Sequence, residues 1–178
     1  DIAGIDMVAK DIGRPLPEQG GAIIEVNAGP GLLMHLKPAE GQPRPVGAAI
    51  VEHLFPGEDS ARIPVVGVTG TRDTTRIARL ISWLVHISGK HVGLACQDGF
   101  FLGARQVDGR NSMNWEAGQR LLINRNVEAA VVESSARMIL SEGLPYDRCS
   151  ISVVTDLGRH EDLADMHIDS DDRLFTVM

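Results

Sequence analysis

Residues 63–75 read IPVVGVTGTRDTT, and this stretch decides the fold class of the 178-residue chain. Its first half is a short, apolar and largely β-branched run, which predicts a buried strand over residues 63–68. Gly70 predicts a turn, and apolar residues at helical spacing follow up to Gly89. We expect the core-facing side of this helix to consist of Ile77, Leu80, Ile81, Leu84 and Val85. Strand, glycine turn and helix together are typical of a phosphate-binding loop, whose backbone N–H groups hold an anion.

The alternation of strands and helices continues to the end of the chain. Apolar runs predict strands over residues 92–96, 129–133 and 150–155, and helical spacing predicts helices over residues 115–123 and 136–142. This alternation favours an α/β fold with a parallel sheet. His160, His167 and the acidic run 169–172 show no metal-ligand spacing, and we expect them on a solvated surface.

The first third of the chain has a different character. A Pro- and Gly-rich stretch, residues 14–21, precedes a β-branched run over residues 22–26 that predicts a buried strand. Helical spacing over residues 46–55 is followed by the sequence PGEDSA, which breaks the pattern. We therefore expect one domain segment over residues 1–55, a linker over 56–61 and a second domain over 62–178.

Composition excludes several classes of protein. The chain has 17 Lys and Arg against 24 Asp and Glu, a formal net charge of −7, so neither nucleic acid nor an anionic membrane is an expected partner. Two cysteines, Cys96 and Cys149, suggest no disulfide framework and no zinc site. We expect a cytoplasmic protein, since no apolar run is long enough to span a bilayer and no leader is visible. The start at Asp1 and the apolar end over residues 175–178 indicate a piece of a longer protein.

Glu25 and Asn27 form the first candidate site. Two residues apart on a strand, they project from the same face, and carboxylate and amide oxygens are suitable ligands for Mg²⁺. Asp6, in an apolar setting, could add a second carboxylate. The alternative is structural: Glu25 as an ordinary strand carboxylate and Asn27 as a turn residue in the sequence NAGPG.

This first segment resembles the end of the ATP-grasp domain of the cyanophycin synthetase family. The resemblance rests on residues 21–31, GAIIEVNAGPG, on the MHL run at 34–36 and on Glu40-Gly41. It implies that Asp6, Glu25 and Asn27 hold the Mg²⁺ that bridges nucleotide phosphates. His35 matches a family histidine, with a substrate-binding and a structural role both open. Ala39 departs from the family, which has a serine there.

The second segment resembles the Mur-ligase-like half of the same family. The resemblance includes CQDG at 96–99, VVESSAR at 131–137 and the stretch 139–149. The family loop reads GTNGKTT, so Gly70, Thr71 and Thr75 are retained, while Arg72, Asp73 and Thr74 replace Asn, Gly and Lys. The resemblance implies ATP binding at Gly70, Thr71, Thr74 and Thr75, and a Mg²⁺ ligand at Glu133.

Two departures weaken the case for ATP hydrolysis in this half. The loop lacks its lysine and carries the Asp73 carboxylate near the phosphate positions, a repulsion of about 1–4 kcal/mol depending on exposure. Asp73 also has a structural use as the N-cap of the following helix. Farther on, Asp156 stands for a family Asn, and His160-Glu161 stand for Asp-His. We therefore expect this half not to hydrolyse ATP, in which case Glu133 is only a strand-end carboxylate.

The resemblance implies an ATP-dependent ligase that joins aspartate and arginine to a growing cyanophycin polymer, with ATP and Mg²⁺ as cofactors and a homo-oligomeric assembly. Three hypotheses stay open: both halves work, only the ATP-grasp half works and the Mur-like half is a scaffold, or the protein is a non-catalytic assembly module. The adenine-gripping part of ATP-grasp and the last lobe of a Mur ligase are missing. We expect the 178-residue chain alone to be inactive.

Overall fold

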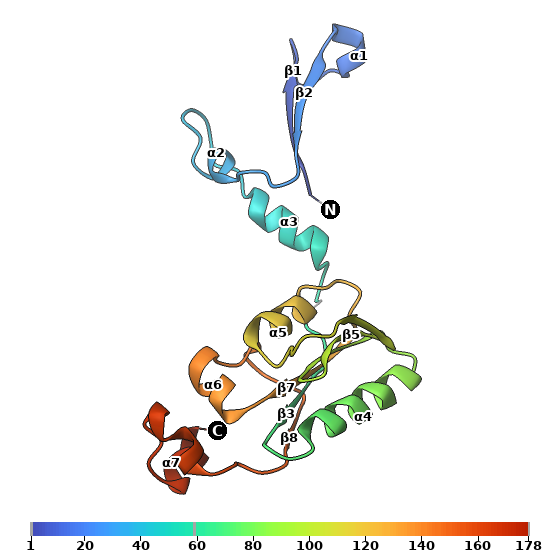
Figure 1. Cartoon of the computed structure of the whole chain (residues 1–178). Helices are drawn as coiled ribbons and strands as arrows, with labels where there is room; N and C mark the ends of the chain where they lie inside the picture. The colour runs from blue at the N-terminus through green and yellow to red at the C-terminus, as the bar shows by residue number, and fades with distance from the viewer. Residues whose placement is uncertain (1, 59, 178) are drawn as a thin grey trace. The chain divides into compact units, whose positions relative to one another are not determined.

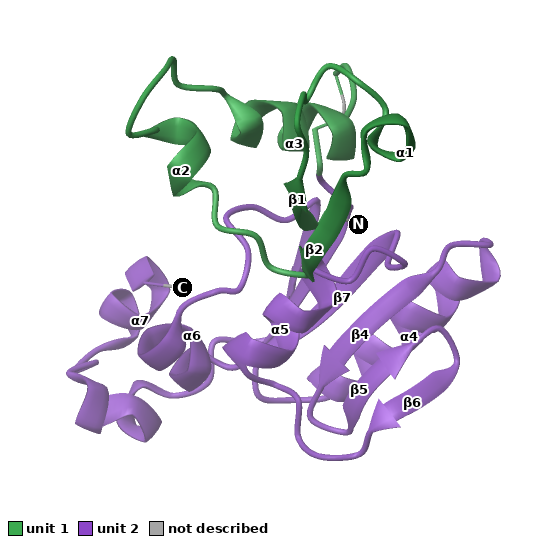
Figure 2. Cartoon of the chain, turned by 90° about the horizontal axis from the view of Figure 1, so that it is seen from above, with its two compact units in different colours: residues 1–61 green, residues 62–178 purple. Residues whose placement is uncertain are grey.

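The computed structural model describes residues 2–58 and 60–177, and the chain divides into two compact units, residues 1–61 and 62–178 (Figure 2). Asp59, inside the expected linker, and the terminal residues Asp1 and Met178 lie outside the described residues. The assignment of the two units to an ATP-grasp end and a Mur-like domain stays a prediction. No helix among the described residues is both long and apolar enough to cross a membrane.

Unit 1 contains a two-stranded antiparallel ribbon and three helices (Figure 1). Its elements are β1 (Gly4–Val8), α1 (Leu16–Gln19), β2 (Ala22–Asn27), α2 (Leu33–Leu36) and α3 (Val46–Leu54). The strand over 22–26 is confirmed, but its predicted burial is wrong: Ile24 is 66% exposed and Val26 is 62% exposed. A ribbon of two strands has two open faces, and none of the described residues in this unit is buried.

Unit 2 is built on a six-stranded sheet in the order β6-β5-β4-β7-β3-β8. The strands are β3 (Val65–Thr69), β4 (Val92–Cys96), β5 (Gly99–Leu102), β6 (Arg105–Asp108), β7 (Ala129–Ser134) and β8 (Ile151–Val154). β4, β7, β3 and β8 run parallel, as the alternating pattern predicts. β5 and β6 are antiparallel strands at one edge of the sheet, which the sequence pattern did not predict.

Two helices cover opposite faces of this sheet, α4 (Thr74–Ile87) and α5 (Trp115–Leu122) (Figure 1). The expected core-facing side of α4 is partly wrong, because Leu80 is 55% exposed and Leu84 is 49% exposed. At about 100° per residue, the side that faces the sheet is centred on Ile81 and Val85 and includes the buried Ala78, so Leu80 and Leu84 point away from it.

The end of the chain forms a small third core. Its elements are α6 (Ala136–Glu142), the 3-10 helix η1 (His160–Met166) and α7 (Asp171–Val177). Leu163, Ile168 and Leu174 are buried together there. The acidic run 169–172 is largely exposed, as expected, while His160 is half-buried and its Nδ1 lies 2.8 Å from Asp171 Oδ1.

Candidate functional site

The carboxyl ends of the parallel strands of unit 2 carry most of its predicted site residues. Gly70 and Thr71 follow β3, and Glu133 is the next-to-last residue of β7; Asp156, which was not a predicted site residue, follows β8. In parallel sheets the crevice at this edge is where ligands bind. The fold therefore collects these residues at one edge, although they are up to 86 positions apart in the sequence.

Glu133 is the centre of a buried hydrogen-bond cluster. Its side chain is fully buried, and its Oε1 accepts hydrogen bonds from Thr74 Oγ1 at 2.7 Å and Thr75 Oγ1 at 2.8 Å. Its Oε2 accepts from the Gln97 backbone N–H at 2.8 Å. Burying a carboxylate is costly unless donors replace water, and three donors do so here. The structure thus brings the predicted metal ligand Glu133 together with the predicted ATP contacts Thr74 and Thr75.

The first half of the same loop holds a second carboxylate, that of Asp156. Thr71 donates to it from its backbone N–H, at 3.1 and 3.2 Å, and from Oγ1, at 2.7 Å, and the Arg72 N–H donates at 3.2 Å. Hydrogen bonding, with that from Thr71 Oγ1 the largest contribution, lowers the pKa of Asp156 to about 2. Sequence reasoning noted Asp156 only as a departure from the family, because a contact 85 positions away leaves no local signal.

Gly70 permits the close approach of the loop to the segment after β8. Its φ is +147°, and a Cβ at this position would overlap Thr155 Oγ1 and lie 3.2 Å from the Asp156 backbone N and O. Glycine is the residue that tolerates both the positive φ and the contact. The predicted turn at Gly70 is confirmed.

Asp73 lies at the N-cap position of α4 but does not cap the helix with its side chain. Its backbone is left-handed, with φ of +55°, and its carboxylate instead pairs with Arg76 Nη1 at 3.1 Å. Both side chains of this pair are largely exposed. Asp73 therefore has the predicted N-cap position, but the predicted capping hydrogen bond is wrong. A capping side chain reaches the helix N–H groups from an extended backbone, and the backbone of Asp73 is left-handed.

In unit 1, the strand register brings the predicted metal ligands to one face of the ribbon. Asp6 lies directly opposite Glu25, and Asn27 is two residues farther along the same strand, opposite Gly4. Side chains directly across an antiparallel ribbon and two apart along a strand share a face. His35 lies on the exposed surface of α2, outside this ribbon.

The donor set of Asp6, Glu25 and Asn27 is suited to a hard cation. Like charges directly opposite each other on a ribbon destabilise it, and a divalent cation bound by both carboxylates would offset that repulsion. Both carboxylates are exposed and accessible. Across residues 2–58 and 60–177, no three His, Cys, Asp or Glu side chains gather in a way that would hold a metal, so any such site needs the Asn27 amide or water as well.

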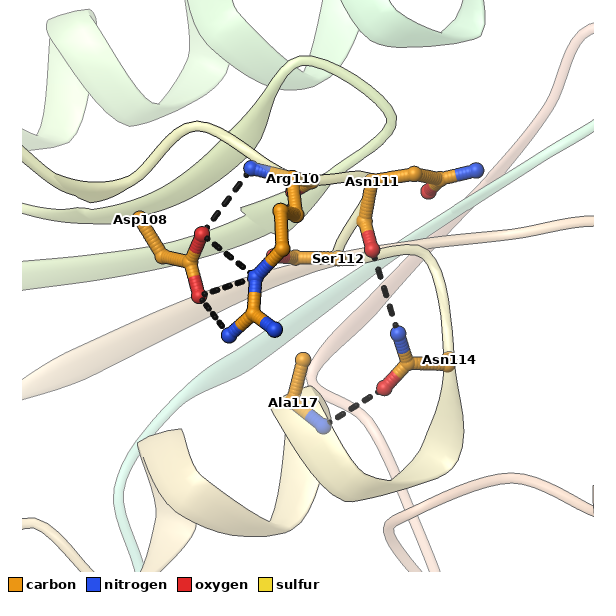
Figure 3. A network of polar contacts seen from close by, with 6 residues as sticks. All are labelled: Asp108, Arg110, Asn111, Ser112, Asn114 and Ala117. Carbon is orange, nitrogen blue, oxygen red and sulfur yellow. Dashed lines mark hydrogen bonds and ion pairs between the residues drawn. The ribbon is translucent and has the colours of Figure 1, made fainter.

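A second polar cluster surrounds the start of α5 and is shown in Figure 3. Arg110 donates to Asp108 through its backbone N–H, Nε and Nη2, with the shortest contact at 2.7 Å, and holds the pKa of Asp108 at about 2. Asn114 caps the helix by accepting from the Ala117 N–H at 2.9 Å. These contacts border a polar hollow of about 220 Å³. They give the β6–α5 connection a defined shape and include none of the predicted site residues.

Comparison with known proteins gives a consistent result. No protein-family model matches the chain. The cyanophycin synthetase of Trichormus variabilis is 41% identical over 154 residues, that of Geminocystis herdmanii 42% over 168, and that of Crocosphaera subtropica 40% over 169. These matches cover 86%, 93% and 94% of this chain but only 17%, 19% and 19% of the relatives, so the chain spans less than a fifth of their length. Over most of its own length, the chain is therefore similar to a part of cyanophycin synthetases.

Proposed function

We propose that this chain is part of an ATP-dependent amide ligase that elongates a polymer of aspartate and arginine. The observation that carries the proposal is the 40–42% identity to cyanophycin synthetases over nearly the whole chain. In such a ligase a carboxylate oxygen attacks the γ-phosphorus of ATP and ADP leaves; the incoming amine then attacks the acyl phosphate carbonyl and phosphate leaves. The ATP-grasp half would add aspartate to the backbone, and the Mur-like half would attach arginine to the aspartate side chain. The cytoplasmic location and the homo-oligomeric assembly remain predictions.

Asp6, Glu25 and Asn27 are the residues that we propose hold Mg²⁺ in the first half. Bound there, the cation would neutralise charge on the transferred phosphoryl group. Asp6 and Glu25 lie directly opposite each other on the ribbon. This pairing supports the role, since it places both carboxylates on one face. For His35, which is exposed on α2, contact with the substrate is a proposal that rests on the resemblance alone.

In the second half, the ATP contacts would be Gly70, Thr71, Thr74 and Thr75, with Glu133 as a Mg²⁺ ligand. The hydrogen bond from Thr75 Oγ1 to Glu133 supports a shared role, because a loop hydroxyl and a strand-end carboxylate are common neighbours of a nucleotide-bound cation.

One observation favours a second candidate function, a ligase whose Mur-like half is a scaffold. The first N–H groups of the loop donate to Asp156, so they are already occupied by a negative charge of the chain itself. With the lysine also absent, the loop offers an incoming phosphate little compensation for its charge. Under this candidate, only the Asp6, Glu25 and Asn27 site serves catalysis.

The test uses the full-length protein that contains this chain. ATP consumption is measured on an aspartyl-arginine primer with aspartate alone, with arginine alone, with both, and with a preformed aspartyl-arginine dipeptide. Three proteins are compared: wild type, Glu25→Ala, and Glu18→Ala as the matched control. Glu18 is an exposed carboxylate of the same unit that belongs to α1 and not to the β1–β2 ribbon.

The proposal predicts that Glu25→Ala abolishes ATP use while Glu18→Ala retains it. Arginine incorporation that follows aspartate identifies both halves as active, whereas ATP use driven only by aspartate or by the dipeptide identifies the Mur-like half as a scaffold. Full activity of Glu25→Ala would overturn the metal assignment. Ligase turnover by the isolated 178-residue chain would overturn our expectation that the piece alone is inactive.

A further inference from the structure

The carboxylate of Asp156 receives more hydrogen bonds than an ordinary surface aspartate. Oδ1 accepts from Thr71 Oγ1 at 2.7 Å and from the Gly158 N–H at 2.9 Å. Oδ2 accepts from Thr155 Oγ1 at 3.0 Å and from the Arg72 N–H at 3.2 Å, and the Thr71 N–H points between the two oxygens. Five donors therefore surround one oxyanion, and two of them, from Thr71 and Arg72, are backbone N–H groups between Gly70 and α4.

Backbone N–H groups in front of a helix, offered by a glycine-containing turn after a strand, are what a phosphate-binding loop presents to an anion. In this chain those groups already have an anionic partner. A carboxylate of the chain and an external phosphate cannot both accept hydrogen bonds from the same N–H groups, and their negative charges repel each other.

Contacts of the neighbouring residues also hold the Asp156 carboxylate in place. The Thr155 N–H donates to the Thr69 carbonyl at 2.9 Å, which extends the parallel pairing of β8 and β3 up to the residue before Asp156. Gly158, with φ of +74°, packs so closely against Thr71 that a Cβ would lie 2.9 Å from Thr71 Cγ2. The segment 155–158 therefore lies against the loop as a formed contact.

We propose that Asp156 is a built-in oxyanion that fills the loop after β3, so that this loop binds an intramolecular carboxylate where a nucleotide phosphate would otherwise bind. Removing the carboxylate alone leaves five donors around a small vacancy. Such a vacancy selects a small oxyanion of carboxylate shape, such as formate, and in its absence the unpaired donors destabilise the fold. This inference concerns only the contact between Asp156 and the loop, and it stands whether or not the chain belongs to a working ligase.

The experiment is a chemical rescue on the 178-residue chain. Thermal unfolding of wild type, Asp156→Ala and Asp156→Asn is followed at pH 7 in sodium formate, in sodium pyrophosphate, and in sodium chloride of equal ionic strength. Asp172→Ala is the matched control, because it removes an exposed carboxylate from α7, away from the loop.

The melting temperature of Asp156→Ala is expected to lie at least ~5 °C below that of wild type. At a formate concentration about ten times the Kd of formate, it is expected to rise by ~3 °C relative to chloride. Asp156→Asn, whose amide still fills the space, is expected to be destabilised without rescue. Wild type and Asp172→Ala are expected to respond to formate and pyrophosphate no more than to chloride. Equal formate responses of Asp156→Ala and Asp172→Ala, or a pyrophosphate response of wild type that exceeds that of chloride, would overturn the proposal.

A second measurement covers the case in which Asp156→Ala does not fold. Thr71→Val keeps the carboxylate and removes only the Oγ1 donor, at 2.7 Å the shortest of the five. Carbon-detected NMR titration of the Asp156 carboxyl group is expected to show its midpoint at higher pH in this variant than in wild type. An unchanged midpoint would contradict the occupied-loop geometry. Neither measurement uses ligase activity, so a failure here is distinguishable from a failure of the proposed function.

Discussion

Two carboxylates, those of Asp156 and Glu133, accept hydrogen bonds from the polar groups of one loop. The first half of the loop, at Thr71 and Arg72, donates to Asp156, and the hydroxyls of Thr74 and Thr75 donate to Glu133. Each carboxylate obtains the donors that water would otherwise supply, and the loop obtains acceptors for its N–H and O–H groups. The same residues that the sequence predicts for ATP are, in this fold, partners of the chain's own acids.

The pKa of Asp156 leads to a pH prediction. Its pKa is lowered from 3.8 to about 2, so its contribution to stability is fully present above about pH 4 and is lost as the pH falls through 2. We expect the free energy of unfolding of Asp156→Asn to fall less steeply than that of wild type between pH 4 and 2. Denaturant titrations at several pH values measure both slopes. Asp108 and Asp147, whose pKa values are also about 2, are present in both proteins, so the difference isolates Asp156; identical slopes would contradict the prediction.

Ser134 and Ser135 are adjacent serines for which we predict opposite effects of mutation to alanine. Ser134 Oγ is fully buried and, among the described residues, is the buried side-chain oxygen without a hydrogen-bond partner. Ser134→Ala removes an unsatisfied hydroxyl and is expected to stabilise the chain by about 1 kcal/mol. Ser135 Oγ accepts from the Met138 N–H at 3.2 Å as the N-cap of α6, so Ser135→Ala is expected to destabilise by about 1 kcal/mol. Urea unfolding of both variants measures the signs, and destabilisation by Ser134→Ala would contradict the first.

At the scale of elements, the sheet of unit 2 combines a parallel centre with a two-strand antiparallel edge. The strands β3, β4 and β7 are fully buried runs covered on both faces by α4 and α5, as parallel strands require. β5 and β6 continue the sheet beyond β4, and β6 is mostly exposed, which suits an edge strand. The position of the loop after β3, between the ends of β7 and β8, is a property of this strand order.

The contact of α5 with the turn after α6 depends on a glycine. A Cβ at Gly118 would overlap Pro145 Cγ and lie 2.7 Å from Pro145 Cβ. Gly118→Ala gains about 1 kcal/mol of helix propensity but forces an overpacked contact that costs about 1–3 kcal/mol, so we expect net destabilisation. A double-mutant cycle with Pro145→Gly tests the cause, because the penalty should disappear when the proline ring is absent. A penalty that is unchanged in the Pro145→Gly background would exclude this contact as its source.

At the scale of the whole molecule, the two units differ in how they bury apolar surface. Unit 2 contains all the buried residues among those described, and most of its buried apolar residues form three clusters. Unit 1 leaves large apolar side chains such as Ile24, Met34 and Val51 more than half exposed. Because apolar burial is the main source of folding free energy, the stability of the chain resides in unit 2.

Hydrogen exchange of the 178-residue chain measures this difference. Amides of β7 and β4, at the centre of the buried sheet, are expected to exchange at least ~100-fold more slowly than those of β1 and β2. The intrinsic rates of unstructured peptides of the same sequence serve as the reference. Equal protection of the β1–β2 ribbon and of β7 would show that unit 1 has a stability of its own, contrary to the prediction.

The sequence alone determined the α/β class of unit 2, because the spacing of apolar residues and the positions of glycine turns are local signals. The strands at 92–96 and 129–133 and the helix at 136–142 are found with bounds within one residue of those predicted. It also determined that Glu25 and Asn27 share a strand face, since they lie two residues apart on one strand, whereas the pairing that places Asp6 opposite Glu25 comes from the structure. Which atoms those residues bind stays a prediction.

Only the tertiary structure decided what surrounds the loop after β3. Asp156 reaches Thr71 across 85 positions and Glu133 reaches Thr74 across 59, and such contacts follow from strand order, which no local pattern encodes. The exposure of the 22–26 strand was decided in the same way, because burial depends on what lies against a face and not on the residues of that face. Local spacing therefore predicts elements and faces, while the partner of each face and of each charge is set by how the chain folds back on itself.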